Sequence, residues 1–272
     1  MYADIETNGR KTPGHHAAAV ARAIDAMRAE LDAPHPLTVL ARRGAFSRYH
    51  FHRVFHDVTA MTPARFLAAL RMAEARRLLL HSAMPVTRIS ARVGYTSPGT
   101  FTTQFGRLTG ITPARFRDLA RSLGDEPVAA RLPAVRAAAG RQAGAALRLS
   151  SPPYAESLVV GQLFPVVSPH RPGLWTLSTG IDRVRLPATP VPGEYLAYLV
   201  VVPAHVRLVD ALVEAQPESY LIGNAHMSLT RDGQQGPAAR LELRRPGPTD
   251  PPILGIMPMR WLIDTNVVHG RR

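Results

Sequence analysis

Histidines and arginines are the side chains of this sequence whose types and spacing could do chemistry. The chain has 11 histidines and no cysteine. His50, His52 and His56 lie close together, and His52 and His56 are four positions apart, so they would share one face of a helix. A zinc site needs three or four ligands, and no nearby carboxylate or cysteine completes one. We therefore expect no metal site, no bound cofactor, and histidines that lie on the surface.

The residue patterns of common enzymes are missing from the sequence. Without cysteine there is no disulfide, no thiolate metal site and no cysteine nucleophile. The C-terminal half carries no glycine-rich phosphate loop, no paired carboxylates and no nucleophile motif. We expect no catalytic residues and a protein that is not an enzyme. Two alternatives stay open, an enzymatic activity in the C-terminal half and a small-molecule-binding or sequestering module.

The basic residues are concentrated in the N-terminal half. The net charge is +13, and residues 1–125 carry 18 bases against 9 acids, whereas residues 149–272 carry 11 against 10. Lys11 is the only lysine, so coding bias explains the choice of arginine. Bias does not explain why acids match bases in one half and not in the other. The distribution therefore indicates a polyanionic partner for the N-terminal half.

A repeat with an offset of 50 residues predicts which elements position these bases. The pentamer TPARF occurs at 62–66 and again at 112–116. Identities at the same offset extend over about 25 positions without a gap, which makes chance a poor explanation. The further pairs are Ala41 and Ala91, Gly44 and Gly94, Ser47 and Ser97, Phe51 and Phe101, Phe55 and Phe105, and Thr59 and Thr109.

Each repeated residue has a local role, and these roles together predict a helix, a turn and a second helix. Gly44 allows a turn that needs positive φ, and Ser47 is placed to cap the helix that follows. Thr62 caps a further helix, and Pro63 takes its first turn. An apolar stripe at helical spacing follows Ser47 and consists of Phe51, Val54, Phe55 and Val58. The second copy uses Gly94, Ser97, Phe101, Phe105, Leu108, Thr112 and Pro113.

Two helix-turn-helix motifs are therefore expected, with the second helix of each in the major groove of DNA. Residues 64–81 read as one connecting helix of about 18 residues, or ~27 Å. Such a connector could hold two recognition helices near one DNA turn, ~34 Å, apart. Arg76 and Arg77 on it are expected on a solvent face, with phosphate contact as the alternative. A helix with Val20, Ile24, Met27 and Leu31 on one face should pack on the first motif.

Two stretches, LARRGAFSRYHFHRVFHDVTAMTPARF and ISARVGYTSPGTFTTQFGRLTGITPARFR, resemble the AraC/XylS family of bacterial transcription regulators. The second is close to that family's motif, in which an apolar residue, a glycine and an aromatic precede two phenylalanines, a glycine and a Thr-Pro pair. The resemblance covers residues 15–121, about 40% of the chain. It implies a seven-helix DNA-binding domain with two helix-turn-helix motifs, in a sequence-specific regulator of transcription.

The same resemblance implies which residues contact DNA. Arg53 is the strongest candidate, because arginine makes the commonest bidentate contact with guanine. The second recognition helix lacks an early Arg, Lys, Gln or Asn, so we expect the first to discriminate sequence and the second to position the protein. The residues carried over are Arg48, Tyr49, His52 and Arg53 in the first helix, and Pro98, Gly99, Thr100, Thr102 and Thr103 in the second.

After residue 153 the residue pattern changes to runs of β-branched residues bounded by glycine and proline. Strands are expected at 157–167, 174–179, 182–188, 194–203, 219–231, 239–245 and 253–263, whereas 205–215 is a short helix or another strand. Short strands without alternating helices predict an antiparallel sandwich or barrel. The chain thus reads as a multidomain α + β protein: a flexible N-terminus (1–14), an all-α DNA-binding domain (15–122), a part-helical linker (123–153) and a β-rich domain (154–266).

The β-rich domain is expected to sense an effector or to mediate oligomerisation. Its candidate pocket aromatics are Trp175, Tyr195, Tyr198, Tyr220 and Trp261, and the alternative for each is an ordinary core or sheet-surface position. The expected partner is double-stranded DNA; RNA polymerase, a small-molecule effector and a second copy of the chain are further candidates. No apolar run approaches ~20 residues and no secretory signal is evident, so we expect no membrane partner and a cytoplasmic protein that is nucleoid-associated when bound to DNA.

Overall fold

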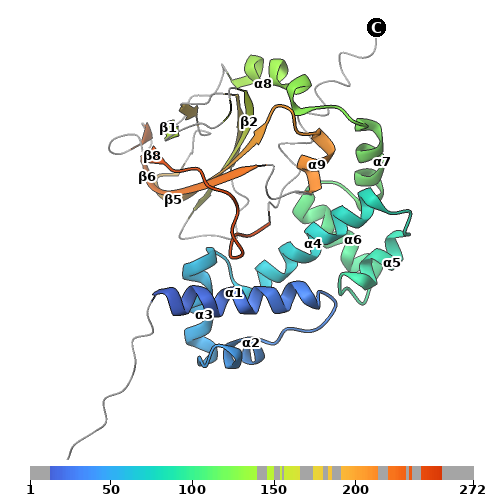
Figure 1. Cartoon of the computed structure of the whole chain (residues 1–272), viewed down its shortest axis with the longest axis vertical. Coiled ribbons are helices and arrows are strands. Elements are labelled where there is room, and N and C mark those ends of the chain that lie inside the picture. Colours follow the sequence, from blue (N-terminus) through green and yellow to red (C-terminus); the bar gives the residue numbers. More distant parts are fainter. Residues whose placement is uncertain are drawn as a thin grey trace, which may run out of the picture. The chain divides into compact units, whose positions relative to one another are not determined.

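The computed structural model describes residues 13–139, 146–149, 154, 156–165, 174–179, 183–185, 191–213, 220–230, 233–234 and 240–252 (Figure 1). Most of the predicted flexible N-terminus, the predicted strand at 253–263 and Trp261 lie outside these residues. The described residues fall into two compact units, one formed by 13–75, 84–101 and 247–252 and the other by the rest. The domain limits given above stay predictions.

Helices fill the N-terminal part of the chain, as the sequence predicts. They are α1 (Pro13–Ala29), α2 (Leu37–Arg43), α3 (Arg48–Thr59), α4 (Pro63–His81), α5 (Val86–Arg92), α6 (Pro98–Thr109) and α7 (Pro113–Leu123), followed by a 3₁₀ turn η1 (Val128–Arg131) and α8 (Leu132–Ala139). The connecting helix predicted at 64–81 is confirmed as α4. None of the described helices is both long and apolar enough to span a membrane.

The first unit has an apolar core between α1, α2 and α3. Val20, Ile24 and Met27 of α1 are fully buried, and they belong to the same core as Phe51 and Phe55 of α3. The spacing of these residues puts one apolar stripe on each helix, and burial of both stripes is the main force that joins them. The prediction that the opening helix packs on the first motif is therefore confirmed.

Eight strands and one helix follow in the described part of the second unit. The strands are β1 (Ala146–Leu149), β2 (Ser157–Pro165), β3 (Leu174–Ser178), β4 (Arg183–Arg185), β5 (Gly193–Pro203), β6 (Leu221–Thr230), β7 (Gly233–Gln234) and β8 (Arg240–Leu241). The segment that read as helix or strand is a helix, α9 (Leu208–Val213). Two strands, β1 and β7, fall in segments that the sequence had not predicted as strands.

The strands form two open sheets. One has the order β3-β2-β5-β6-β7 and is antiparallel throughout; the other has the order β4-β1-β8, with β1 and β8 parallel. An antiparallel C-terminal sheet region is thus confirmed, but the sheet does not close, so the predicted sandwich or barrel shape is not confirmed. Both sheets contribute to one apolar core, which includes Leu147, Val159, Leu199 and Leu241.

The start of the predicted linker is bonded to the sheet region. Three backbone hydrogen bonds of 2.8 Å each join residues 126–129 to residues 204–208. They run from the amide of Val128 to the carbonyl of Val206, from Ala129 to Ala204, and from Leu208 to Glu126. These backbone groups pair between the two segments as they do between strands, and they hold the start of the predicted linker to the residues that follow β5.

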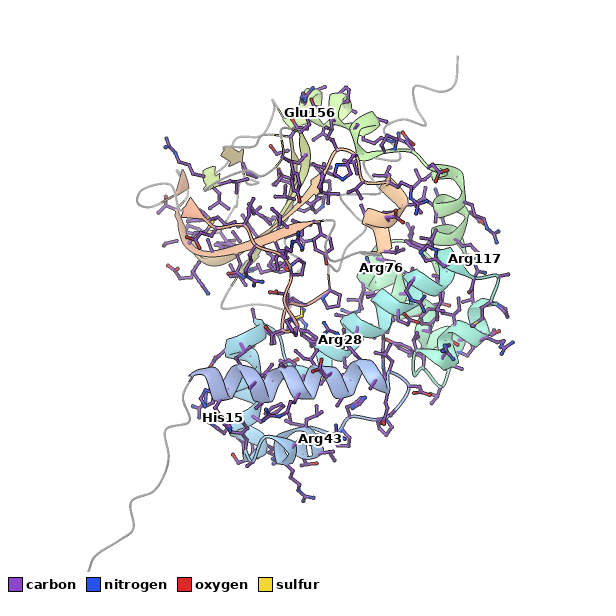
Figure 2. All side chains as sticks on the ribbon, viewed as in Figure 1. His15, Arg28, Arg43, Arg76, Arg117 and Glu156 are labelled. Atoms are coloured by element: carbon purple, nitrogen blue, oxygen red, sulfur yellow. The ribbon has the colours of Figure 1, made fainter. Side chains whose placement is uncertain are left out.

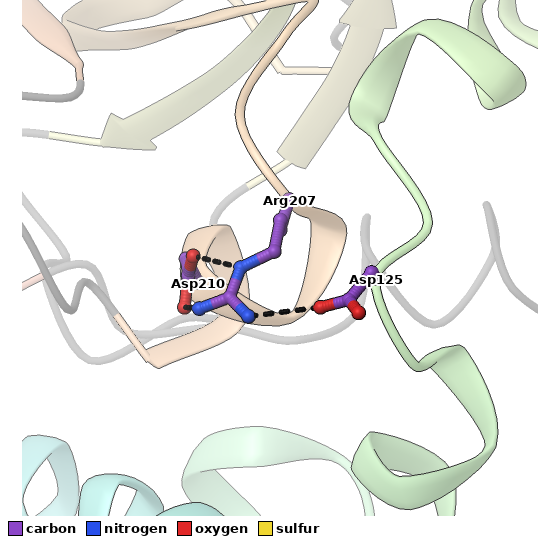
Figure 3. A network of polar contacts seen from close by, with 3 residues as sticks. All are labelled: Asp125, Arg207 and Asp210. Carbon is purple, nitrogen blue, oxygen red and sulfur yellow. Dashed lines mark hydrogen bonds and ion pairs between the residues drawn. The ribbon is translucent and has the colours of Figure 1, made fainter.

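An exposed arginine lies beside these bonds. Arg207 contacts Asp210 at 2.7 Å and Asp125 at 3.0 Å (Figure 3). The hydrogen bonds that Arg207 donates to Asp210, and after them the one that it donates to Asp125, raise the pKa of Arg207 above its ordinary value. Arg131, whose side chain is buried, forms a second pair with Glu126 at 2.6 Å. Water screens the exposed pair strongly, so this pair should contribute less to stability than the backbone bonds and the pair between Arg131 and Glu126.

Candidate nucleic-acid interface

The repeat is present in the structure with a one-residue insertion that the sequence comparison missed. Helix α5 lies 49 residues after α2, whereas α6 lies 50 residues after α3. The same turn bond confirms the smaller offset, because the amide of Phe46 donates to Ala41 O (3.0 Å) and that of Tyr95 to Ser90 O (2.9 Å). The gap-free offset of 50 is therefore wrong before the second helix of each pair. Ala41 and Gly44 are not the equivalents of Ala91 and Gly94.

The glycine predicted to need positive φ in the first turn does not have it. Gly44 has a φ of −99°, and the left-handed residue is Ala45, with a φ of 54°, at the position where the second turn has Gly94, with a φ of 80°. Position 44 requires a residue without a side chain for another reason. A Cβ atom there would lie 2.7 Å from Cδ2 of Phe46, so the glycine lets that ring pack against the turn.

The four predicted helix caps are confirmed. Each capping hydroxyl accepts a hydrogen bond from the backbone amide three residues later, which satisfies one unpaired amide of the first helical turn. The acceptors are Ser47 (His50 N, 3.3 Å), Thr62 (Arg65 N, 3.4 Å), Ser97 (Thr100 N, 3.3 Å) and Thr112 (Arg115 N, 3.3 Å). The starts of α3, α4, α6 and α7 are thereby fixed by local chemistry.

A pair of buried threonines ends α3 and α6 in the same way. The hydroxyl of Thr59 donates to Phe55 O (2.8 Å) and lies 3.1 Å from Met61 O. Thr109 makes the same two contacts with Phe105 O (2.7 Å) and Ile111 O (3.0 Å). Their identity at an offset of 50 was visible in the sequence, but nothing local showed that both hydroxyls are buried. Helices α3 and α6 thus end with the same geometry.

The exposed face of α3 carries all the residues predicted to contact DNA from the first motif. Arg48, Tyr49, His52 and Arg53 are exposed, and Tyr49 is the most exposed large apolar side chain among the described residues, at 73%. On the opposite face, Phe51 is fully buried. A face of arginine, histidine and tyrosine with no acid in the first turn suits contact with phosphates and base edges.

The exposed face of α6 is smaller and less charged. Pro98, Gly99, Thr100 and Thr103 are exposed, and Thr102 is half-buried. Sequence reasoning missed Arg107, which is exposed one turn after Thr103 and bonds to Gln104 Oε1 through Nη2 (2.9 Å) and Nε (3.1 Å). Its spacing from Thr103 was the available signal. Helix α6 therefore carries a basic side chain, Arg107, in its last turn and none in its first turn.

A family model described as a helix-turn-helix domain matches residues 40–118, which contain both helix pairs. This segment is an AraC-type helix-turn-helix domain.

Named relatives match about a third of the chain. A Mycobacterium tuberculosis protein named HTH-type transcriptional regulator Rv1931c is 37% identical over 83 residues, which are 30% of this chain and 32% of the relative. An Escherichia coli protein named RCS-specific HTH-type transcriptional activator RclR is 36% identical over 84 residues, 31% of this chain and 30% of the relative. The match thus spans about a third of each of these relatives.

A solved structure, the DNA-binding domain of AdpA in complex with a target DNA, is also similar. It is 29% identical to this chain, covers 40% of this chain and 97% of its own, and has a TM-score of 0.38.

Some arginines near the AraC-type domain's exposed faces are structural instead. Arg71 of α4 donates from Nε to Leu31 O (2.8 Å) and from Nη2 to Ala33 O (3.1 Å), and its guanidinium lies 5.8 Å from the ring of Tyr95. Burial lowers the pKa of Arg71, and the charges of Tyr95 and Asp32 oppose that shift. Arg71 therefore fixes the loop after α1.

The structure corrects the predicted position of Arg76. It was expected on a solvent face of the connecting helix, yet it is only 2% exposed, and its Nη1 donates to Leu212 O of α9 (3.1 Å). Arg117, which Figure 2 labels, likewise reaches back to α4, donating from Nε to Leu79 O at 3.2 Å. Arg77, next to Arg76, is exposed as predicted. The error arose because α9, which covers Arg76, is distant in the sequence.

The histidines near the first turn pack on an aromatic ring. The ring of Phe46 lies 5.1 Å from that of His50, 5.6 Å from His16 and 5.7 Å from His15. Within the described residues, no group of three or more histidine, cysteine, aspartate or glutamate side chains could hold a metal ion. His52 and His56 are exposed on α3.

The structure brings together two of the candidate ligand-binding aromatics. Trp175 on β3 and Tyr198 on β5 both pair with Gln162 on β2, and Tyr198 also pairs with Asn224 on β6. These four residues form one row across the sheet. Tyr195 lies apart, buried in the core on the other face of β5, with its hydroxyl donating to Val191 O at 2.7 Å. Tyr220 is half-buried just before β6.

Proposed function

We propose that the chain is a sequence-specific, double-stranded-DNA-binding regulator of transcription. The observation that carries the proposal is the exposed basic and aromatic face of α3 within an AraC-type helix-turn-helix domain. The names of the relatives support it, since they are transcriptional regulators and activators. The excess of bases over acids in residues 1–125 supports it as well.

The two recognition helices would have different roles in DNA binding. In this proposal Arg48, Tyr49, His52 and Arg53 of α3 read bases and neighbouring phosphates. The contacts of α6 come from Pro98, Gly99, Thr100, Thr102 and Thr103, and Arg107 adds a phosphate contact. Arginine supplies the discrimination in the first motif, whereas short polar side chains mainly set the position of the second.

The sheet region would sense an effector or hold two copies together. The row of Trp175, Gln162, Tyr198 and Asn224 supports the sensing role, since two aromatic rings with amide groups between and beside them suit a small polar ligand. RNA polymerase and a second copy of the chain are further partners in this proposal. The protein would act in the cytoplasm, on the nucleoid.

Selection from a random duplex library tests the proposal most directly. Recovery of a shared sequence by the full chain is expected, and its length would report whether one or two major grooves are read. The affinity for that duplex should fall steeply with salt, because each neutralised phosphate releases counterions and contributes about −0.9 to the slope of log K against log salt. No enriched sequence, or binding that salt leaves unchanged, would count against the proposal.

A further inference from the structure

The first two residues of α3 form a contact that its base-reading role does not by itself require. The Nη2 group of Arg48 donates a hydrogen bond to the hydroxyl of Tyr49. The central carbon of the same guanidinium lies 4.5 Å from the centre of the Tyr49 ring. Both side chains are exposed, so the contact is not imposed by packing in a core.

Adjacent residues on a helix point in directions about 100° apart and do not normally face each other. Arg48 therefore has to fold back over its neighbour to make the contact. The first turn of α3 contains no acid, and in the described part of the chain the contacts of this guanidinium are with Tyr49. The tyrosine thus orients a cation that would otherwise sample many rotamers at the helix start.

The pair is specific to the first recognition helix. The equivalent positions on α6 are Pro98 and Gly99, which carry neither a charge nor a ring. A Cβ atom at Gly99 would meet only Ser97 Oγ, at 3.6 Å, so the second helix has room for a side chain there but does not use it. The pair formed by Arg48 and Tyr49 at the start of α3 therefore has no counterpart at the start of α6.

We propose that Tyr49 is a positioning residue that holds the Arg48 guanidinium for a guanine next to α3. This inference rests on the proposed function. Guanine presents O6 and N7 as a pair of acceptors, which matches two parallel N–H groups of a guanidinium. With one N–H bonded to the Tyr49 hydroxyl and the cation resting on the ring, the remaining N–H groups are restricted before DNA arrives. Such preorganisation favours one base over others more than it favours DNA in general.

The test compares base preferences selected from a random duplex library by the full-length protein and its variants. Arg48→Ala should reduce the preference for guanine at one position by roughly 5- to 100-fold. Tyr49→Leu should reduce the preference at the same position, and the double variant should be little worse than either single one. Tyr49→Phe keeps the ring and should retain part of the preference. His56→Ala, exposed further along α3, is the matched control and should leave that position unchanged.

Failure of this inference differs from failure of the proposed function. If the wild-type protein selects no sequence, the proposed function itself is wrong. If the wild type selects a sequence but Tyr49→Leu leaves the Arg48-dependent position unchanged, Tyr49 does not position Arg48. Additive losses at two different positions would also overturn the inference, because they would show that the two side chains read DNA independently.

Discussion

The Nη1 atom of Arg76, on α4, lies 3.1 Å from the backbone carbonyl oxygen of Leu212, on α9. The arginine is 2% exposed, so its charge has been removed from water. Burying a guanidinium is costly unless its N–H groups find acceptors. The contact joins the helix that connects the two helix pairs to the helix that directly follows β5. Within this unit, the burial of Arg76 and its hydrogen bond therefore tie α4 to α9.

Two substitutions of Arg76 should separate what its aliphatic carbons contribute to stability from what its charge and hydrogen bond contribute. Arg76→Ala removes both and should lower the free energy of unfolding by roughly 2–4 kcal/mol. Arg76→Met keeps an apolar side chain of similar length and should cost about 1 kcal/mol, because the buried charge disappears with its hydrogen bond. Urea denaturation followed by circular dichroism measures both. Arg77→Ala, on the exposed neighbour, should change stability by less than about 0.5 kcal/mol. Equal losses from Ala and Met would mean that the hydrogen bond, and not the stem, is what matters.

The two turns predict opposite effects of exchanging alanine and glycine. Ala45 has a φ of 54° and Gly94 a φ of 80°, and left-handed backbone costs an L-residue about 1–2 kcal/mol. Ala45→Gly should therefore stabilise the fold by up to about 1 kcal/mol, after the greater freedom of glycine in the unfolded chain is subtracted. Gly94→Ala should destabilise it by roughly 2–4 kcal/mol, because the new Cβ would also lie 2.7 Å from Leu31 O. Thermal unfolding compares the two, and a stabilised Gly94→Ala variant would contradict the assignment of the turn.

Local features of the AraC-type domain were readable from the sequence, and features set by distant contacts were not. The caps at Ser47 and Thr112 and the buried Phe51 and Phe105 follow from residue type and helical spacing, which act within a few residues. The inserted residue in the second turn was hidden because Gly44 and Gly94 happen to be identical at the wrong offset.

Long-range pairing explains the remaining errors. Arg76 looked like a solvent-facing arginine because the sequence of α4 does not reveal that Leu212 lies over it. Strand positions were largely predictable from β-branched runs, but the order β3-β2-β5-β6-β7 and the row that joins Trp175 to Tyr198 depend on register between strands far apart in the sequence. The exposed face of α3 was found because its residues are local, while their contacts with DNA remain predictions.

Loss of the buried threonine hydroxyls should weaken both helix ends by similar amounts. Thr59→Val keeps the shape of the side chain but leaves the amide of Met61 without its 3.2 Å acceptor, so we expect a loss of about 1–2 kcal/mol in unfolding free energy. Thr109→Val should cost a similar amount, since Thr109 makes the same two carbonyl contacts. Thr38→Val, exposed on α2, is the control and should be near neutral. A large difference between Thr59 and Thr109 in urea denaturation would show that the two ends are not equivalent.

Arg53 and Arg107 should affect DNA binding in different ways. Arg53 is exposed on the face of α3 that carries Tyr49, and Arg53→Ala should weaken binding to the selected duplex by about 1–3 kcal/mol while relaxing the preference at one base position. Arg107 is proposed to hold a phosphate, so Arg107→Ala should weaken binding to all duplexes alike and reduce the salt slope by about 0.9. Fluorescence anisotropy at several salt concentrations, on the selected duplex and on one with that position changed, distinguishes the two. If Arg53→Ala weakened both duplexes equally, Arg53 would be a phosphate contact and the sequence discrimination of α3 would have to come from its other exposed side chains.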